Sequence, residues 1–158
     1  MGKGRVRLEN GKGLFDVIEL EIAVFMRRAE AVRLARLNGR DLDRSAYLLL
    51  RYLERNGPVG IKYLADDLQL DISTASRQIA ALEAKGLVER TTDPQDARIS
   101  MLRIADEVPA LLAEVRRNRE QFYAELLKEW PEEDCRAFGE LLRKFNRTAE
   151  QYQKKRGK

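Results

Sequence analysis

Two predicted helices joined by a four-residue turn constrain the fold more than any other feature of the sequence. The first is expected over residues 61–68, and the turn is 69–72. The second begins at Ser73, a residue type that caps helix N-termini, and runs to Lys85. Gly86 follows, and glycine readily adopts the left-handed conformation that ends helices. Two short helices around such a turn form a helix-turn-helix.

A β-hairpin is predicted directly after these helices. Residues 87–91 and 99–104 are short runs with branched or alternating apolar side chains, which are typical of strands. The residues between them, 92–98, are polar and include a proline. The pattern therefore indicates two strands joined by a polar loop, and a hairpin in this position is the wing of a winged helix-turn-helix.

Longer helices are predicted on both sides of this core. No proline or glycine interrupts 14–37, and its apolar stripe is wider than one packing partner covers, which suggests burial between a domain and a second subunit. An Asn-Gly pair at 38–39 ends this helix. Asp43 is a favourable N-cap for the next helix, which runs up to the break at 56–58.

Two more helices are predicted towards the C-terminus. One starts at Asp106 and runs to Lys128. The other starts at Pro131, where three acidic residues favour a helix N-terminus, and it carries apolar residues along one face. The predicted fold class is mainly α with a small β-hairpin wing.

Composition excludes several classes of protein. A single cysteine, Cys135, cannot form an intramolecular disulfide, and without any histidine the usual ligands for zinc or iron are missing, so no metal or other cofactor is expected. No apolar run approaches the roughly 18 residues of a membrane span, and the first residues lack the apolar core of a secretory signal. We therefore expect a cytoplasmic protein with no membrane partner. No histidine base, phosphate-binding glycine loop or metal-ligand spacing supports an enzyme.

The distribution of charge limits how this chain would bind a nucleic acid. The net charge of +4 suggests such a partner, but the net positive charge is concentrated at the two ends, 1–13 and 143–158, and the stretch between them is acidic overall. Any DNA contact must therefore use local basic groups. The ends themselves are most simply interpreted as solvated tails.

The segment IKYLADDLQLDISTASRQIAALEAKGLVERTTDPQDARISMLRIAD closely resembles the core of the MarR (multiple antibiotic resistance regulator) family. Within it, DPQDAR is similar to the family's wing motif, and the flanking helices agree as well, so the resemblance covers about 14–153. It implies a homodimer whose first, fifth and sixth helices interlock, with one winged domain per subunit. The domain organisation predicted is a winged helix-turn-helix domain at 42–104, dimerisation helices at 14–37 and 106–153, and basic tails at 1–13 and 154–158.

The start of the second helix of the helix-turn-helix has the chemistry of a major-groove reader. Its first turns carry small polar side chains on the face opposite Ala75, Ile79 and Leu82, and helix N-terminal amides favour phosphate. Arginine and glutamine are the residue types that make bidentate bonds to guanine and adenine edges. The residues predicted to bind DNA here are Ser73, Thr74, Ser76, Arg77 and Gln78. Alternatively, Ser73 only caps the helix and Arg77 is a solvated surface charge.

The wing adds one predicted DNA contact. Arg98 lies at the end of the polar loop, and the negative potential of a narrow minor groove attracts arginine. In the resembling family the aspartate two residues earlier, here Asp96, steadies the wing and its arginine. The alternative is an ordinary exposed ion pair, worth at most about 1 kcal/mol.

Two further features of the sequence allow a regulatory role. Phe25, Met26 and Arg27 on the first helix are candidates to line an effector cleft where that helix meets the winged domain, although packing in the core or dimer is the simpler interpretation of each. Some members of the resembling family sense oxidants through a thiol, but three acidic residues precede Cys135 and disfavour a reactive thiolate there. Inert packing is the expected role of Cys135.

The function predicted from these features is sequence-specific DNA binding by a transcriptional regulator. The hypothesis is a homodimeric repressor on a pseudopalindromic operator of double-stranded DNA, released by a small effector molecule that is phenolic or otherwise anionic. Two alternatives stay open. The winged fold could act through protein contacts alone, or the protein could be an activator or architectural DNA binder without an effector.

Overall fold

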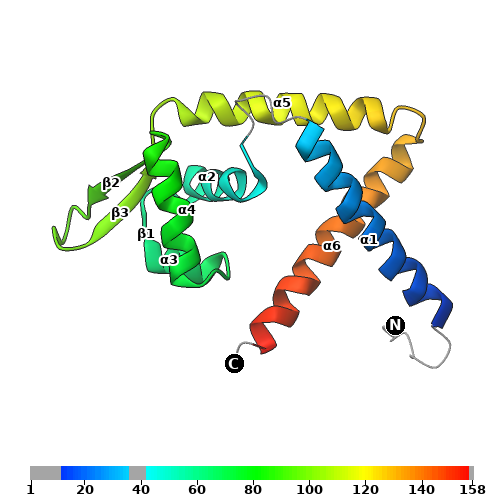
Figure 1. Ribbon diagram of the computed structural model, residues 1–158, viewed down its shortest axis with the longest axis horizontal. Coiled ribbons are helices and arrows are strands. Elements are labelled where there is room, and N and C mark those ends of the chain that lie inside the picture. Colours follow the sequence, from blue (N-terminus) through cyan, green and yellow to red (C-terminus); the bar gives the residue numbers. More distant parts are fainter. Residues whose placement is uncertain (1–11, 36–41, 157–158) are drawn as a thin grey trace. The chain divides into compact units, whose positions relative to one another are not determined.

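The computed structural model describes residues 12–35 and 42–156 of the chain. It confirms the predicted fold class, mainly α with a β-hairpin wing (Figure 1). The elements are α1 (Lys12–Ala35), α2 (Arg44–Asn56), β1 (Val59–Gly60), α3 (Ile61–Asp67), α4 (Ile72–Ala84), β2 (Val88–Thr92), β3 (Ser100–Ile104), α5 (Val108–Leu126) and α6 (Glu132–Arg156). The chain divides into two compact units, with the boundary after Pro109.

The three strands form one antiparallel sheet in the order β1-β3-β2. In the hairpin, Val88 pairs with Ile104 and Thr92 with Ser100, and on the other edge of β3, Val59 pairs with Leu102. Strand β1 was not predicted because only two residues separate Pro58 from α3. The β2–β3 hairpin extends beyond the helices α2 to α4, as expected for a wing (Figure 1).

The winged part has an apolar core built from the inner faces of its helices and sheet. Helix α2 contacts β3 and α4, α3 contacts α4, and α4 contacts β2. The largest side chains without exposed surface include Leu50 from α2, Leu64 from α3, Ile79 from α4 and Leu102 from β3. Burying each such side chain stabilises the fold by about 1.5–3 kcal/mol. No polar or charged residue is buried in the part of the chain that the structure describes.

Two predicted helix ends are confirmed by their capping geometry. The carboxylate of Asp43 accepts a hydrogen bond from the backbone N–H of Ala46 at 2.8 Å, so Asp43 is the N-cap of α2. Gly86 adopts φ 70°, and its neighbour Leu87 donates its N–H to the carbonyl of Leu82 at 2.9 Å. This left-handed glycine turns the chain from α4 into β2.

Helix α5 begins at Val108, so the predicted start at Asp106 is wrong. The sheet holds the preceding residues, because Ala105 donates its N–H to the carbonyl of Leu87 at 3.1 Å, and the Asp106 carboxylate accepts from Arg103 of β3 at 3.2 Å. Residues 106–107 then form a turn that leads into the helix.

The two long helices at the ends differ slightly from their predicted bounds. The predicted stop of the first helix at 38–39 lies outside the described residues, as do residues 1–11 of the predicted N-terminal tail. Helix α6 continues to Arg156 and so includes part of the predicted C-terminal tail, 154–158. Among the helices that the structure describes, none is long and apolar enough to cross a membrane.

Replacing Tyr52 of α2 by phenylalanine is expected to stabilise the protein by about 1 kcal/mol, because a buried hydroxyl without a partner loses its hydration and gains nothing in return. Tyr52 is buried, and its hydroxyl lies near the Asp67 carboxylate without forming a hydrogen bond of good geometry to any described residue. Burial, and then the neighbouring Asp67 carboxylate, raise the pKa of Tyr52 from 10.0 to about 12.

The raised pKa also gives this variant a signature in alkaline solution. A group whose folded pKa is raised contributes stability below its ordinary pKa and loses it as the pH rises through the folded value. Urea unfolding should therefore show the wild type losing stability between pH 10 and pH 12 more steeply than Tyr52→Phe. Equal losses in the two proteins would contradict this account of Tyr52.

Candidate nucleic-acid interface

Asp71, and not Ser73, caps the N-terminus of α4, which corrects the predicted cap. Oδ1 of Asp71 accepts from the backbone N–H of Thr74 at 2.8 Å and from the hydroxyl of Ser73 at 2.5 Å. Oδ2 accepts from the hydroxyl of Thr74 at 2.6 Å. These bonds, the one from Ser73 first, hold the pKa of the Asp71 carboxyl well below its usual range. Aspartate is as good a cap as serine, so the cap lies two residues earlier than predicted and the helix starts at Ile72.

Helix α4 presents opposite faces to the core and to solvent. Ala75, Ile79 and Leu82 are buried. The residues predicted to bind DNA are on the other side or at its margins: Ser73, Ser76 and Arg77 are exposed, and Thr74 and Gln78 are half-buried. The structure thus brings all of them onto the accessible part of the first two turns. Their role in DNA binding stays a prediction.

The turn between α3 and α4 contains a residue in the left-handed conformation. Gln69 has φ 55°, a left-handed conformation that residues other than glycine and asparagine rarely adopt. Its neighbour Leu70 donates its N–H to the carbonyl of Ala65 at 2.9 Å, which closes the end of α3. The sequence does not signal this conformation, because glutamine has no preference for it.

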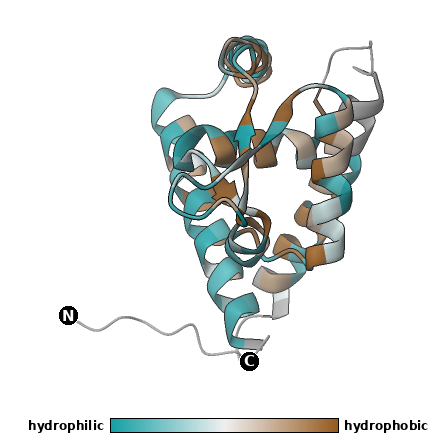
Figure 2. Ribbon diagram, turned by 90° about the vertical axis from the view of Figure 1, so that its left-hand side faces the viewer, coloured by the Kyte–Doolittle hydropathy of each residue, from teal (hydrophilic) through white to brown (hydrophobic). Residues whose placement is uncertain are grey.

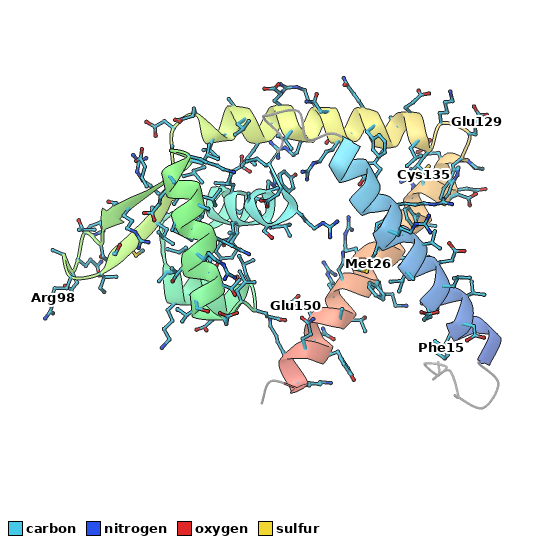
Figure 3. The ribbon with its side chains drawn as sticks, in the orientation of Figure 1. Phe15, Met26, Arg98, Glu129, Cys135 and Glu150 are labelled. Atoms are coloured by element: carbon cyan, nitrogen blue, oxygen red, sulfur yellow. The ribbon has the colours of Figure 1, made fainter. Side chains whose placement is uncertain are left out.

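The tip of the wing is ordered by aspartate side chains. Asp93 accepts from the backbone N–H of Gln95 at 2.7 Å. Asp96 accepts from the Nε of Arg98 at 3.1 Å and from its backbone N–H at 3.0 Å, and these bonds, the one from the side chain first, lower the pKa of the Asp96 carboxyl. The Arg98 side chain is nevertheless 91% exposed and projects from the end of the hairpin (Figure 3). Asp96 therefore orients Arg98 without covering it.

An open hollow of about 420 Å³ lies along the wing. Its lining combines two arginines with three hydroxyl side chains and one alanine: Arg90, Thr91, Thr92, Ala97, Arg98 and Ser100. Arg90 forms an ion pair of 2.7 Å with Glu83 near the end of α4, so it ties the wing to that helix. The sequence analysis missed Arg90, because a pair seven residues apart across a helix end and a strand has no periodic signal.

The remaining predicted site residues lie outside this interface. Phe25, Met26 and Arg27 of α1 are exposed, and the effector cleft to which they were assigned stays a prediction. Cys135 is half-buried near the start of α6 (Figure 3). Within the described ranges no three of the acidic and cysteine side chains are grouped so that they could hold a metal ion.

Comparison with known proteins identifies the family. The profile of the MarR family matches residues 42–100. The uncharacterized HTH-type transcriptional regulator YxaD of Bacillus subtilis (strain 168) is 43% identical over 133 residues, which cover 84% of this chain and 93% of YxaD.

Solved structures with lower sequence identity share the fold. FabT of Streptococcus pneumoniae, crystallised in complex with DNA, has a TM-score of 0.68 and 18% identity, covering 87% of this chain and 98% of its own. PcaV of Streptomyces coelicolor, a transcriptional regulator in complex with its natural ligand, has a TM-score of 0.62 and 20% identity, covering 92% and 99%. From the family profile and the similarity to YxaD, we conclude that the chain belongs to the MarR family of HTH-type transcriptional regulators.

Proposed function

We propose that this protein is a homodimeric repressor that binds a pseudopalindromic operator and is released by a small ligand. The observation that carries the proposal is the accessible polar face of α4 together with the exposed Arg98 at the wing tip. In a winged helix-turn-helix, such a helix enters the major groove and a wing arginine suits the adjacent minor groove. This is a binding function, and no catalytic activity is proposed.

Exposed apolar residues on the long helices support a dimer. Soluble monomers rarely leave a large continuous apolar surface in contact with water. Figure 2 shows hydrophobic and hydrophilic residues around α5, which is seen end-on at the top. Along one face of α6, the exposed large apolar residues are Phe138, Leu141, Leu142, Phe145 and Tyr152. A second copy of the chain is the partner that we propose for this face.

The dimer determines the form of the operator. Two recognition helices related by a twofold axis contact successive major grooves about 34 Å apart, so the two half-sites are inverted repeats one helical turn apart. A dimer bound over a promoter would exclude RNA polymerase, which is the basis of the proposed repression. A protein with this function acts where the DNA lies, and we propose the cytoplasm as its location.

Release by a ligand requires only that the ligand prefers one spacing of the recognition helices. Such coupling usually amounts to about 1 to 3 kcal/mol. The fold neighbour PcaV was crystallised with its natural ligand, which supports a small-molecule effector, and we propose a phenolic or other small anion. The predicted place is a cleft that includes Phe25, Met26 and Arg27 of α1. A thermal-shift screen of phenolic and other small anions in which none raises the melting temperature would refute the effector.

Fluorescence anisotropy on DNA from the intergenic region upstream of the gene tests the DNA-binding function. The native duplex should bind at least about tenfold more tightly than a scrambled duplex at physiological salt. Arg77→Ala and Arg98→Ala should each weaken binding by about 5- to 150-fold, because each removes about 1–3 kcal/mol of groove contacts. The matched control is Arg136→Ala, an exposed arginine of α6, which should bind as the wild type does.

Equal, weak binding to native and scrambled DNA that neither substitution changes would contradict the proposal. The winged fold would then serve protein contacts, or the operator would lie elsewhere, and genome-wide capture of bound DNA would decide between them. If the protein binds specifically but raises transcription of the adjacent gene, it is an activator and the repressor part of the proposal is wrong.

A further inference from the structure

The bonds at the start of α4 fix which way its two hydroxyl groups point. The pKa of Asp71 lies well below its usual range, so this side chain is a carboxylate at neutral pH and only accepts hydrogen bonds. The hydroxyls of Ser73 and Thr74, at 2.5 and 2.6 Å from its oxygens, must therefore donate to it. A hydroxyl has one hydrogen to donate, and in both residues Asp71 uses it.

The hydroxyls of Ser73 and Thr74 are left with lone pairs alone for any other partner. Phosphate oxygens, O6 and N7 of guanine and O4 of thymine are all acceptors, so none of them can bond to these two hydroxyls while the hydroxyls donate to Asp71. The exposed groups of the major groove that donate are N4 of cytosine and N6 of adenine. The carboxylate of Asp71 also places a negative charge where the amides of a helix N-terminus would otherwise attract phosphate.

We propose that Asp71 is a specificity determinant that makes the hydroxyls of Ser73 and Thr74 act only as acceptors, which selects cytosine or adenine on the strand that they face. The inference rests on the DNA-binding function proposed above and adds to it the type of base read by this turn. Arg77 and Gln78, one turn later, supply the donors for guanine and adenine edges. The first turn of α4 would therefore offer hydroxyl acceptors to the bases, and the next turn would offer N–H donors.

Replacing Asp71 by asparagine should free the hydrogen of one hydroxyl, that of Thr74, while keeping the N-cap of α4. Oδ1 accepts from the Thr74 N–H and the Ser73 hydroxyl, whereas Oδ2 accepts only from the Thr74 hydroxyl. Asparagine caps helices as well as aspartate, and it keeps an oxygen for the first two bonds. Its amide NH₂ takes the place of Oδ2 and donates to Thr74, which frees the Thr74 hydrogen to point outward.

The experiment is selection of half-sites from a random duplex library, followed by anisotropy on the selected duplexes. Wild-type protein should prefer cytosine or adenine over guanine or thymine by about tenfold at the position that Thr74 contacts, and Asp71→Asn should remove that preference by improving binding to guanine and thymine. Thr74→Val keeps its backbone N–H but lacks the hydroxyl, so it should show no preference at that position, with or without Asp71→Asn. Circular dichroism verifies that each variant folds.

The outcomes separate this inference from the function on which it rests. If the wild type selects no sequence, both are overturned. If it selects a specific sequence but Asp71→Asn keeps the preference for cytosine or adenine, or Thr74→Val leaves that preference unchanged, the DNA-binding function stands. The proposal that Asp71 determines base specificity is then wrong.

Discussion

At 200 mM salt the protein is expected to bind its operator about four decades more weakly than at 50 mM. Each phosphate that a basic side chain neutralises releases condensed cations, so the logarithm of affinity falls with the logarithm of salt by about 0.9 per contact. A dimer with about eight such contacts has a slope near −7. Anisotropy titrations at several salt concentrations measure this slope directly.

Single substitutions show which basic side chains contribute to the dependence of affinity on salt. Arg98 is exposed at the wing tip and occurs twice in a dimer, so Arg98→Ala should make the slope shallower by about 2. Arg136 lies on α6 and pairs with Glu132 at 2.6 Å, and Arg136→Ala should leave the slope unchanged. A wild-type slope shallower than about −3 would mean that most of the proposed phosphate contacts do not exist.

Periodicity and turn chemistry predicted the fold because they are local. The spacing of Ala75, Ile79 and Leu82 predicts the buried face of α4, and the polar residues opposite it then become the candidate interface. Glycine at position 86 predicts the left-handed residue that the structure contains. These features depend on a few neighbouring residues, so the sequence alone is sufficient to predict them.

The sequence-based predictions failed where two neighbouring residues could both play the same structural role, or where the structure depends on contacts between distant residues. Asp71 and Ser73 are both favourable caps, and the choice between them depends on where the turn from α3 delivers the chain. Asp106 has the chemistry of a helix start, but its bond to Arg103 keeps it with the sheet. The pair of Arg90 with Glu83 depends on how the wing packs against α4. The direction of the Ser73 and Thr74 hydroxyl bonds depends on which residue caps α4, so the sequence did not predict it either.

Phe145→Asp is expected to turn the protein into a monomer and to lower operator affinity by at least about a hundredfold. Phe145 lies in the apolar row of α6 and is 52% exposed in the single chain. In the proposed dimer the partner covers it, so aspartate there loses about 1.5–3 kcal/mol of apolar burial per copy and adds an unpaired charge to the interface. A monomer holds one half-site at a time and forfeits the affinity gained by linking two contacts, which typically amounts to 10²–10⁴-fold.

Sedimentation equilibrium and anisotropy on the full operator measure the two effects in the same samples. Gln151→Asp is the matched control, since it adds the same charge to an exposed position of α6, and helical periodicity places it away from the apolar row. This variant should remain a dimer and bind as the wild type does. Circular dichroism must show both variants fully helical, so that lost affinity reflects lost pairing. A folded Phe145→Asp protein that stays dimeric would mean that α6 does not form the interface, whereas a monomer that keeps full affinity would mean that each subunit binds its half-site alone.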